Sequence, residues 1–72
     1  MDTATFLKKF AEVLEVSEGS ITTADRLDSL GSWDSLAVVR FLAYAQLEHQ
    51  VKVGGVSLRA CQTVADLMRL LD

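Results

Sequence analysis

Apolar residues recur at helical spacing in two stretches of the chain, one near each end. In residues 3–15 the apolar arc is made of Phe6, Leu7, Phe10, Ala11, Val13 and Leu14, opposite Lys8, Lys9, Glu12 and Glu15. In the second stretch the shared face is made of Val64, Leu67, Met68 and Leu71, after Thr63 as N-cap and Asp66 at the capping-box position. This spacing predicts two amphipathic helices, each of which must bury its apolar face. Asp2 or Thr3 is the expected cap of the first.

Residues 35–49 form a third pattern, apolar almost all the way round and free of Gly and Pro. At helical spacing one arc holds Val38, Val39, Phe41, Leu42, Ala45 and His49, and the opposite arc holds Leu36, Ala37, Arg40, Ala43, Tyr44 and Leu47. Both arcs cannot be buried in a chain of 72 residues. We therefore expect the first arc to face the core and the second to face a partner.

The segments between these helices lack a regular pattern. Residues 16–34 are unusually long for a loop inside a compact domain, and we expect four isolated apolar residues to anchor it to the core. These residues are Ile21, Leu27, Leu30 and Trp33. Further along, residues 51–53 are predicted to be extended, Gly54-Gly55 to break the chain, and Ser57 to cap a single helical turn over 58–61.

The composition predicts one folded domain over residues 1–72, with half of the residues hydrophobic. Because Cys61 is the only cysteine and no signal peptide is evident, we expect a cytoplasmic protein. No apolar run approaches the ~20 residues of a membrane span. Residues 12–34 hold six acids against Arg26, a local charge of −5, which favours basic partners over nucleic acid. The alternative is a solvated acidic loop.

Ser35 is the candidate for chemistry, because its hydroxyl lies at a predicted helix start beside Asp34. Unpaired backbone N–H groups and the helix dipole make such a position favourable for a phosphate. A serine hydrolase is excluded, since His49, the only histidine, lies fourteen residues further along the same helix, roughly 21 Å away. His49 and Cys61 form no recognised metal-ligand set. We expect a partly buried His49, a small core residue in Cys61, no metal and no catalysis.

The chain resembles the acyl and peptidyl carrier proteins over essentially its whole length. The resemblance is carried by Leu30-Gly31, Asp34-Ser35-Leu36, Val51-Lys52-Val53 and Thr63-Val64-Ala65-Asp66-Leu67. It implies an all-α fold, a four-helix bundle with a long loop between helices 1 and 2 and a short third helix. It further implies that a phosphopantetheinyl transferase attaches 4′-phosphopantetheine from coenzyme A to Ser35. Acyl or aminoacyl groups would be held on this arm as thioesters and passed between biosynthetic enzymes.

The resemblance also implies roles for residues near Ser35. Asp34 would present the hydroxyl and meet the metal site of the transferase, with a simple helix cap as the alternative. Leu36 would be bound by partner enzymes; the alternative is that Leu36 is a leucine of the core. The expected partner face consists of Asp34, Leu36, Ala37, Arg40, Tyr44 and Leu47.

Two departures from the family pattern bear on the pathway. Fatty-acid-type carriers usually place several acids on the second helix, whereas Glu48 is the only acid in residues 35–49. This favours a specialised lipid, polyketide or natural-product carrier, or an aminoacyl carrier loaded by an adenylating enzyme. Trp33, directly before Asp34, either anchors the loop to the core or belongs to the partner surface.

A non-enzymatic interaction module, with Ser35 unmodified and the second helix as a docking surface, is the main alternative. The intact Asp34-Ser35-Leu36 argues against it, because a docking protein needs no hydroxyl there. We expect a monomer, since a carrier must visit several enzymes. The pattern of residues does not identify the cargo.

Overall fold

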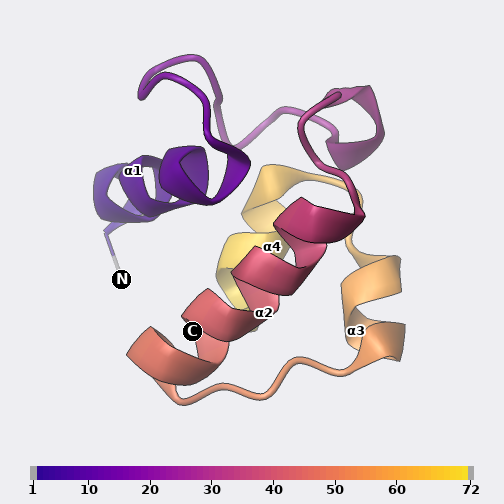
Figure 1. Ribbon diagram of the computed structural model, residues 1–72. Helices are drawn as coiled ribbons and strands as arrows, with labels where there is room; N and C mark the ends of the chain where they lie inside the picture. The colour runs from indigo at the N-terminus through magenta and orange to yellow at the C-terminus, as the bar shows by residue number, and fades with distance from the viewer. Residues whose placement is uncertain (1, 72) are drawn as a thin grey trace.

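The structure, a computed structural model, describes residues 2–71, which form four α-helices and one short 3₁₀ helix. The helices are α1 (Thr3–Leu14), α2 (Ser35–His49), α3 (Gly55–Ala60) and α4 (Val64–Leu70), and the 3₁₀ helix η1 spans Leu27–Ser29. In Figure 1, α2 crosses the middle of the molecule, α1 lies to one side and α3 lies at the opposite edge. The predicted all-α bundle, with a long first loop and a short third helix, is confirmed.

The helix ends follow local capping chemistry. The first helix ends one residue earlier than predicted, because Glu15 adopts a left-handed φ of 59° and its N–H turns back to the carbonyls of Ala11 and Glu12. At the start of α4, the Thr63 hydroxyl accepts the Asp66 N–H at 3.3 Å and the Asp66 carboxylate accepts the Thr63 N–H at 3.1 Å. The predicted capping box is therefore confirmed. Asp2 occupies the N-cap of α1 but makes no side-chain capping bond.

The expectation for the third helix is wrong in its start and its cap. α3 begins at Gly55, not after Ser57, and the Leu58 N–H already donates to the Gly54 carbonyl at 3.0 Å. Gly54 is the N-cap residue, and no side chain caps the helix. None of the residues of α3 is buried, and Leu58 is the residue that packs against the core. The third helix is thus a lightly attached element at the edge of the bundle.

Aromatic rings from α1 and α2 form the centre of the core. Phe6, Phe10 and Phe41 have no exposed surface, and the rings of Phe10 and Phe41 meet edge to face with centroids 6.2 Å apart. The fully buried Val64 and Leu67 of α4 complete this centre. Three helices therefore share one core, and α3 covers its edge.

The long loop is anchored as predicted. Ile21 and Leu27 are buried, while Leu30 and Trp33 are half-buried and pack against the same core. The main chain adds attachments that the sequence pattern did not predict. The Leu27 N–H donates to the Gln62 carbonyl at 2.9 Å, and the N–H groups of Val64 and Ala65 donate to the carbonyls of Asp25 and Thr23 at 3.0 Å each. The loop is therefore held along the start of α4, which fixes the position of η1.

The buried face of α2 differs from the expected arc. It consists of Ala37, Phe41, Tyr44 and Ala45, at i, i+4, i+7 and i+8. The expectation that Ala37 and Tyr44 lie on an open partner face is wrong, because their exposed fractions are 1% and 8%. Tyr44 tolerates burial because its hydroxyl is hydrogen-bonded to Nε2 of the half-buried His49 at 2.9 Å. Val39, expected in the buried arc, is instead 61% exposed.

Candidate functional site

Ser35 is the first residue of α2, and its side chain is exposed where the long loop ends. The preceding residue, Asp34, is extended, with φ −110° and ψ −174°, and its Oδ1 accepts the Ala37 N–H at 2.9 Å. The Asp34 carbonyl also accepts the Val38 N–H at 2.9 Å. The capping role of Asp34 is thus confirmed, while its role towards a transferase remains a prediction. Together these bonds hold the backbone on both sides of the Ser35 hydroxyl.

The start of α2 has unused backbone donors beside this hydroxyl. The N–H groups of Ser35 and Leu36 find no hydrogen-bond partner within residues 2–71. Such donors, with the positive end of the helix dipole, stabilise a nearby anion. An exposed primary hydroxyl next to free N–H groups therefore fits attachment of a phosphate-containing group.

His49, the only histidine, lies too far from Ser35 to activate its hydroxyl. Ser35 and His49 are the first and last residues of α2, roughly 21 Å apart along the helix axis. The His49 ring is instead engaged with the Tyr44 hydroxyl. Ser35 and His49 therefore cannot form a nucleophile–base pair. Within residues 2–71, no three His, Cys, Asp or Glu side chains gather as a metal site, and no helix has the length and apolarity to cross a membrane.

Of the remaining residues of the predicted partner face, three are exposed and Arg40 forms an ion pair. Leu36 and Leu47 are 56% and 76% exposed, and Asp34 is exposed. Arg40 is only partly exposed and pairs with Glu15, at the end of α1, over 3.4 Å. Val39 and Ala43 are also exposed and lie with Leu36 and Leu47 in one stripe of α2, although Val39 was expected in the buried arc. The spacing of three residues from Leu36 to Val39 does place the two on one face of a helix. This spacing did not identify the exposed face, because both faces of α2 are apolar.

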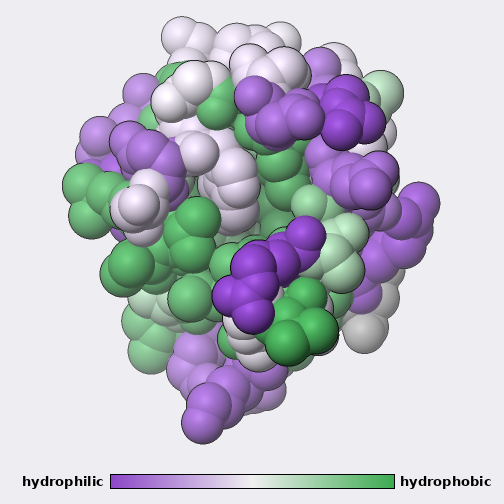
Figure 2. Space-filling view, turned by 90° about the vertical axis from the view of Figure 1, so that its right-hand side faces the viewer, coloured by the Kyte–Doolittle hydropathy of each residue, from purple (hydrophilic) through white to green (hydrophobic). Residues whose placement is uncertain are grey.

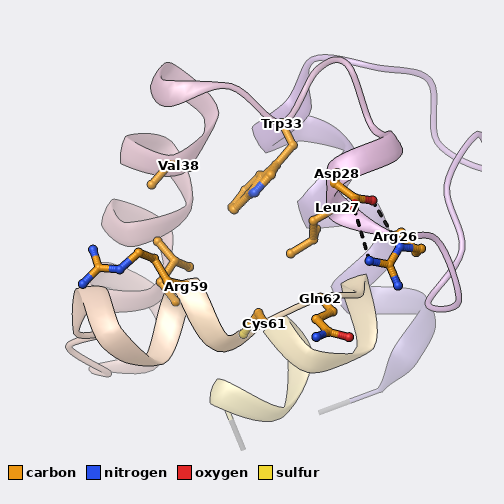
Figure 3. A pocket seen from close by; sticks show the side chains of 9 residues that line it. Arg26, Leu27, Asp28, Trp33, Val38, Arg59, Cys61 and Gln62 are labelled. Atoms are coloured by element: carbon orange, nitrogen blue, oxygen red, sulfur yellow. Dashed lines mark hydrogen bonds and ion pairs between the residues drawn. The ribbon is translucent and has the colours of Figure 1, made fainter.

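A pocket of about 340 Å³ lies next to the start of α2. Figure 3 shows Trp33 and Leu27 pointing into it from the loop and Val38 on α2 at one side. Cys61 lies across the pocket from Trp33 (Figure 3). Figure 2 faces the side that carries α3, where green apolar side chains gather around the middle with purple hydrophilic groups beside and over them. The lining consists of Arg26, Leu27, Asp28, Trp33, Val38, Leu58, Arg59, Cys61 and Gln62. These residues come from separate segments, so sequence patterns could not identify the pocket.

Trp33 connects this pocket to the core. Its ring centroid lies 5.6 Å from that of Phe10 and 6.0 Å from that of Phe41. The loop-anchor interpretation of Trp33 is therefore confirmed, and the same ring also forms part of the pocket wall.

Three titratable groups at the pocket, Arg26, Asp28 and Cys61, have pKa values displaced in the direction that keeps their ordinary charge state. Arg26 donates two hydrogen bonds of 3.2 Å to Asp28, which raise the pKa of Arg26 and lower the pKa of Asp28. Burial, followed by the nearby Asp66 carboxylate, raises the pKa of the Cys61 thiol. The expectation that Cys61 packs as a small apolar residue is consistent with its half-buried position against the core.

In a comparison with known protein families, the chain matches the family described as phosphopantetheine attachment site over residues 4–71. Comparisons with curated proteins and with solved structures gave no significant match. The family match spans all four helices and the loop that leads to Ser35. The chain therefore belongs to the phosphopantetheine-binding family of acyl and peptidyl carrier proteins, whose members carry a covalently attached 4′-phosphopantetheine group.

Proposed function

We propose that Ser35 is the attachment point and that the chain shuttles acyl groups between enzymes of a specialised biosynthetic pathway. The observation that carries this proposal is the exposed Ser35 hydroxyl at the first residue of α2, inside a family match that covers residues 4–71. When attached, the arm supplies a thiol that holds the cargo as a thioester. The chain itself provides the tether point and a surface for partners, which gives the cargo a high effective concentration at each enzyme.

Three groups of the chain prepare the site for attachment. Ser35 supplies the hydroxyl, and the N–H groups of Ser35 and Leu36 lie at the helix start where a phosphate is stabilised. Asp34 uses only Oδ1 for capping, so within residues 2–71 its Oδ2 has no hydrogen-bond partner. This second oxygen is available to contact the metal site of a phosphopantetheinyl transferase.

The exposed stripe of α2 supports a partner surface that is more apolar than acidic. It consists of Leu36, Val39, Ala43 and Leu47, with Arg40 at its margin. Glu48, the only acid of α2, pairs with Lys9 of α1 over 3.8 Å. An apolar stripe favours partner enzymes that bury side chains over partners that present only a basic patch. This supports a specialised carrier rather than one of primary fatty-acid synthesis, working as a monomer that visits each enzyme in turn.

The test is loading of the purified protein by a promiscuous phosphopantetheinyl transferase with coenzyme A and Mg²⁺, followed by intact-protein mass spectrometry. We expect one phosphopantetheine addition to the wild type and none to Ser35→Ala. Ser57→Ala, which removes an exposed serine from the first turn of α3, is the matched control and should load normally.

Two results would overturn the proposal. One is the absence of any addition to the wild type, and the other is an addition that persists in Ser35→Ala. The first result would favour the interaction module, for which the exposed stripe of α2 supplies the docking surface. Circular dichroism of Ser35→Ala should match that of the wild type, because Asp34 caps α2 and an exposed substitution of this kind changes stability by no more than about 0.5 kcal/mol.

A further inference from the structure

We propose that Trp33 is a specificity-determining residue and that the pocket it lines selects compact, uncharged apolar acyl groups, aromatic ones above all, over aminoacyl groups. The inference rests on the proposed function, because it takes Ser35 as the point from which the cargo is tethered. It adds a cargo class to a carrier whose sequence leaves the cargo open.

The attachment point lies at the edge of the pocket. Trp33 and Val38 both line the pocket, and Ser35 lies between them in the chain. Along α2, Ser35 and Val38 are separated by only about 4.5 Å of helix axis. A flexible arm on Ser35 therefore starts within one helical turn of the pocket wall, and its far end can fold back into the pocket.

The size and lining of the pocket favour a compact apolar group. Leu27, Trp33, Val38, Leu58 and Cys61 supply the apolar part of its wall. Its volume of about 340 Å³ lies near the lower end of the ~300–1,000 Å³ range of ligand sites. It cannot extend deeper past Trp33, because Phe10 and Phe41 behind the indole are fully buried. A short or ring-shaped acyl group fits this space, whereas a long linear chain does not.

Trp33 gives the pocket a rigid aromatic wall. The rings of Phe10 and Phe41 hold the indole from the core side, tilted by 51° and 75°. In Figure 3 the indole reaches into the space opposite Leu27. An aromatic group that enters this space can pack against the indole in the offset or edge-to-face arrangement that aromatic pairs prefer. Because the indole is already held in place, this contact requires little additional ordering of the side chain.

The charges around the pocket disfavour an ammonium group. Asp28 is the only acid among the lining residues, and both of its oxygens already accept hydrogen bonds from Arg26. The Arg59 guanidinium points away from Trp33 and Leu27 (Figure 3). The Asp66 carboxylate near Cys61 is also occupied, because it accepts the N–H groups of Gln62 and Thr63 and pairs with Arg69. An α-ammonium group would therefore enter the pocket without a free anionic partner, which is unfavourable for a desolvated charge. An uncharged acyl group of the same shape meets no such cost.

The test compares two cargoes that differ only in this charge. The transferase loads the wild type from 3-phenylpropanoyl-coenzyme A or from phenylalanyl-coenzyme A, which share a carbon skeleton and differ by the ammonium group. Loading is verified by intact mass. The readouts are the fluorescence of Trp33, the only tryptophan, and the rate at which hydroxylamine releases each cargo, relative to the same group on coenzyme A.

We expect release of the 3-phenylpropanoyl group to be slowed about tenfold, which corresponds to burial of most of a phenyl ring. The phenylalanyl group should be released within about twofold of its rate on coenzyme A. Trp33 emission should shift with the 3-phenylpropanoyl cargo and not with the arm alone. Cys61→Phe fills the pocket and should load normally but lose the protection, whereas Val56→Phe, at a position 77% exposed on α3, should keep it.

The inference is overturned by equal release of the two cargoes, by protection that persists in Cys61→Phe, or by a Trp33 shift already complete with the empty arm. Trp33→Phe keeps an aromatic ring and should lose part of the protection, so full protection in this variant would remove Trp33 from its role. Failure of the wild type to load at Ser35 would instead contradict the proposed function. The mass measurement therefore separates the two failures.

Discussion

The carboxylate of Asp34 accepts the backbone N–H of Ala37 at 2.9 Å, and the side chain of Ala37 is buried against the core. This pair of residues therefore sets both the first turn of α2 and the face that α2 directs inward. Ser35 lies between them, with its side chain exposed. The proposed attachment hydroxyl is thus presented by a segment of backbone that is held in place before any partner arrives.

Replacing Asp34 should separate its capping role from its charge. Asp34→Ala should lower the free energy of unfolding by about 1 kcal/mol, because the Ala37 N–H loses its acceptor. Asp34→Asn should keep most of this stability, since asparagine is an equally good cap. Urea unfolding measures the stability of both variants. The rate at which the transferase loads Asp34→Asn measures the contribution of the carboxylate charge. If Asp34→Asn loads at the wild-type rate, the carboxylate charge plays no part in meeting the transferase.

Two substitutions on α2 test which face is buried. Phe41→Ala should cost ~3–5 kcal/mol, because the fully buried ring contacts Phe10 and Trp33 and its removal leaves a cavity. Val39→Ala, at an exposed position on the same helix, should change stability by no more than about 0.5 kcal/mol. Thermal unfolding of both variants makes the comparison. Similar losses of stability in the two variants would contradict the assignment of Phe41 to the buried face of α2 and of Val39 to its exposed stripe.

The Arg40–Glu15 ion pair provides a charge-swap test of the partner surface. Arg40 is partly exposed and Glu15 is exposed, so Arg40→Glu should cost less than about 1 kcal/mol. The double variant Arg40→Glu/Glu15→Arg restores an ion pair while keeping the reversed charge on α2. If Arg40 contacts partners directly, both variants should reduce kcat/KM of a partner enzyme for the carrier. Recovery in the double variant would show that Arg40 acts by attaching α1 to α2.

Asp66 should make stability depend on acidic pH. The N–H groups of Gln62 and Thr63 donate to its carboxylate and lower its pKa in the folded protein. A carboxyl whose pKa is lower in the folded than in the unfolded state stabilises the fold above the unfolded value and loses this contribution as the pH falls. The contribution should therefore disappear below about pH 4, near the ordinary aspartate pKa.

Asp66→Asn provides the comparison. Its Tm should be lower than that of the wild type at neutral pH, and the difference should shrink as the pH falls below about 4. Thr63→Ala removes the other half of the capping box without removing the charge. It should lower Tm while leaving the acid dependence in place. A constant difference in Tm between Asp66→Asn and the wild type across this pH range would contradict the assignment.

Features that depend on neighbours in the chain were predictable from sequence. The bounds of α2, the capping box of Thr63 and Asp66, and the position of Ser35 at a helix start were all predicted correctly. Caps and helical periodicity involve residues within about four positions of one another, so the sequence contains the information directly. The short α3 was the exception, since its glycine start has no side-chain cap to signal it.

Helical spacing and capping residues were enough to specify α1, α2 and α4, the loop that had to be anchored, and the helix-start hydroxyl that we propose carries the arm. Which side of α2 is buried could not be read from its residues, because both sides are apolar and the outcome depends on how α1 and α4 pack around it. The pocket likewise exists only in the folded chain, since Leu27, Trp33, Val38 and Cys61 meet through loop bonds to the start of α4. Local periodicity specifies elements, whereas burial and cavities arise from contacts between residues far apart in the sequence.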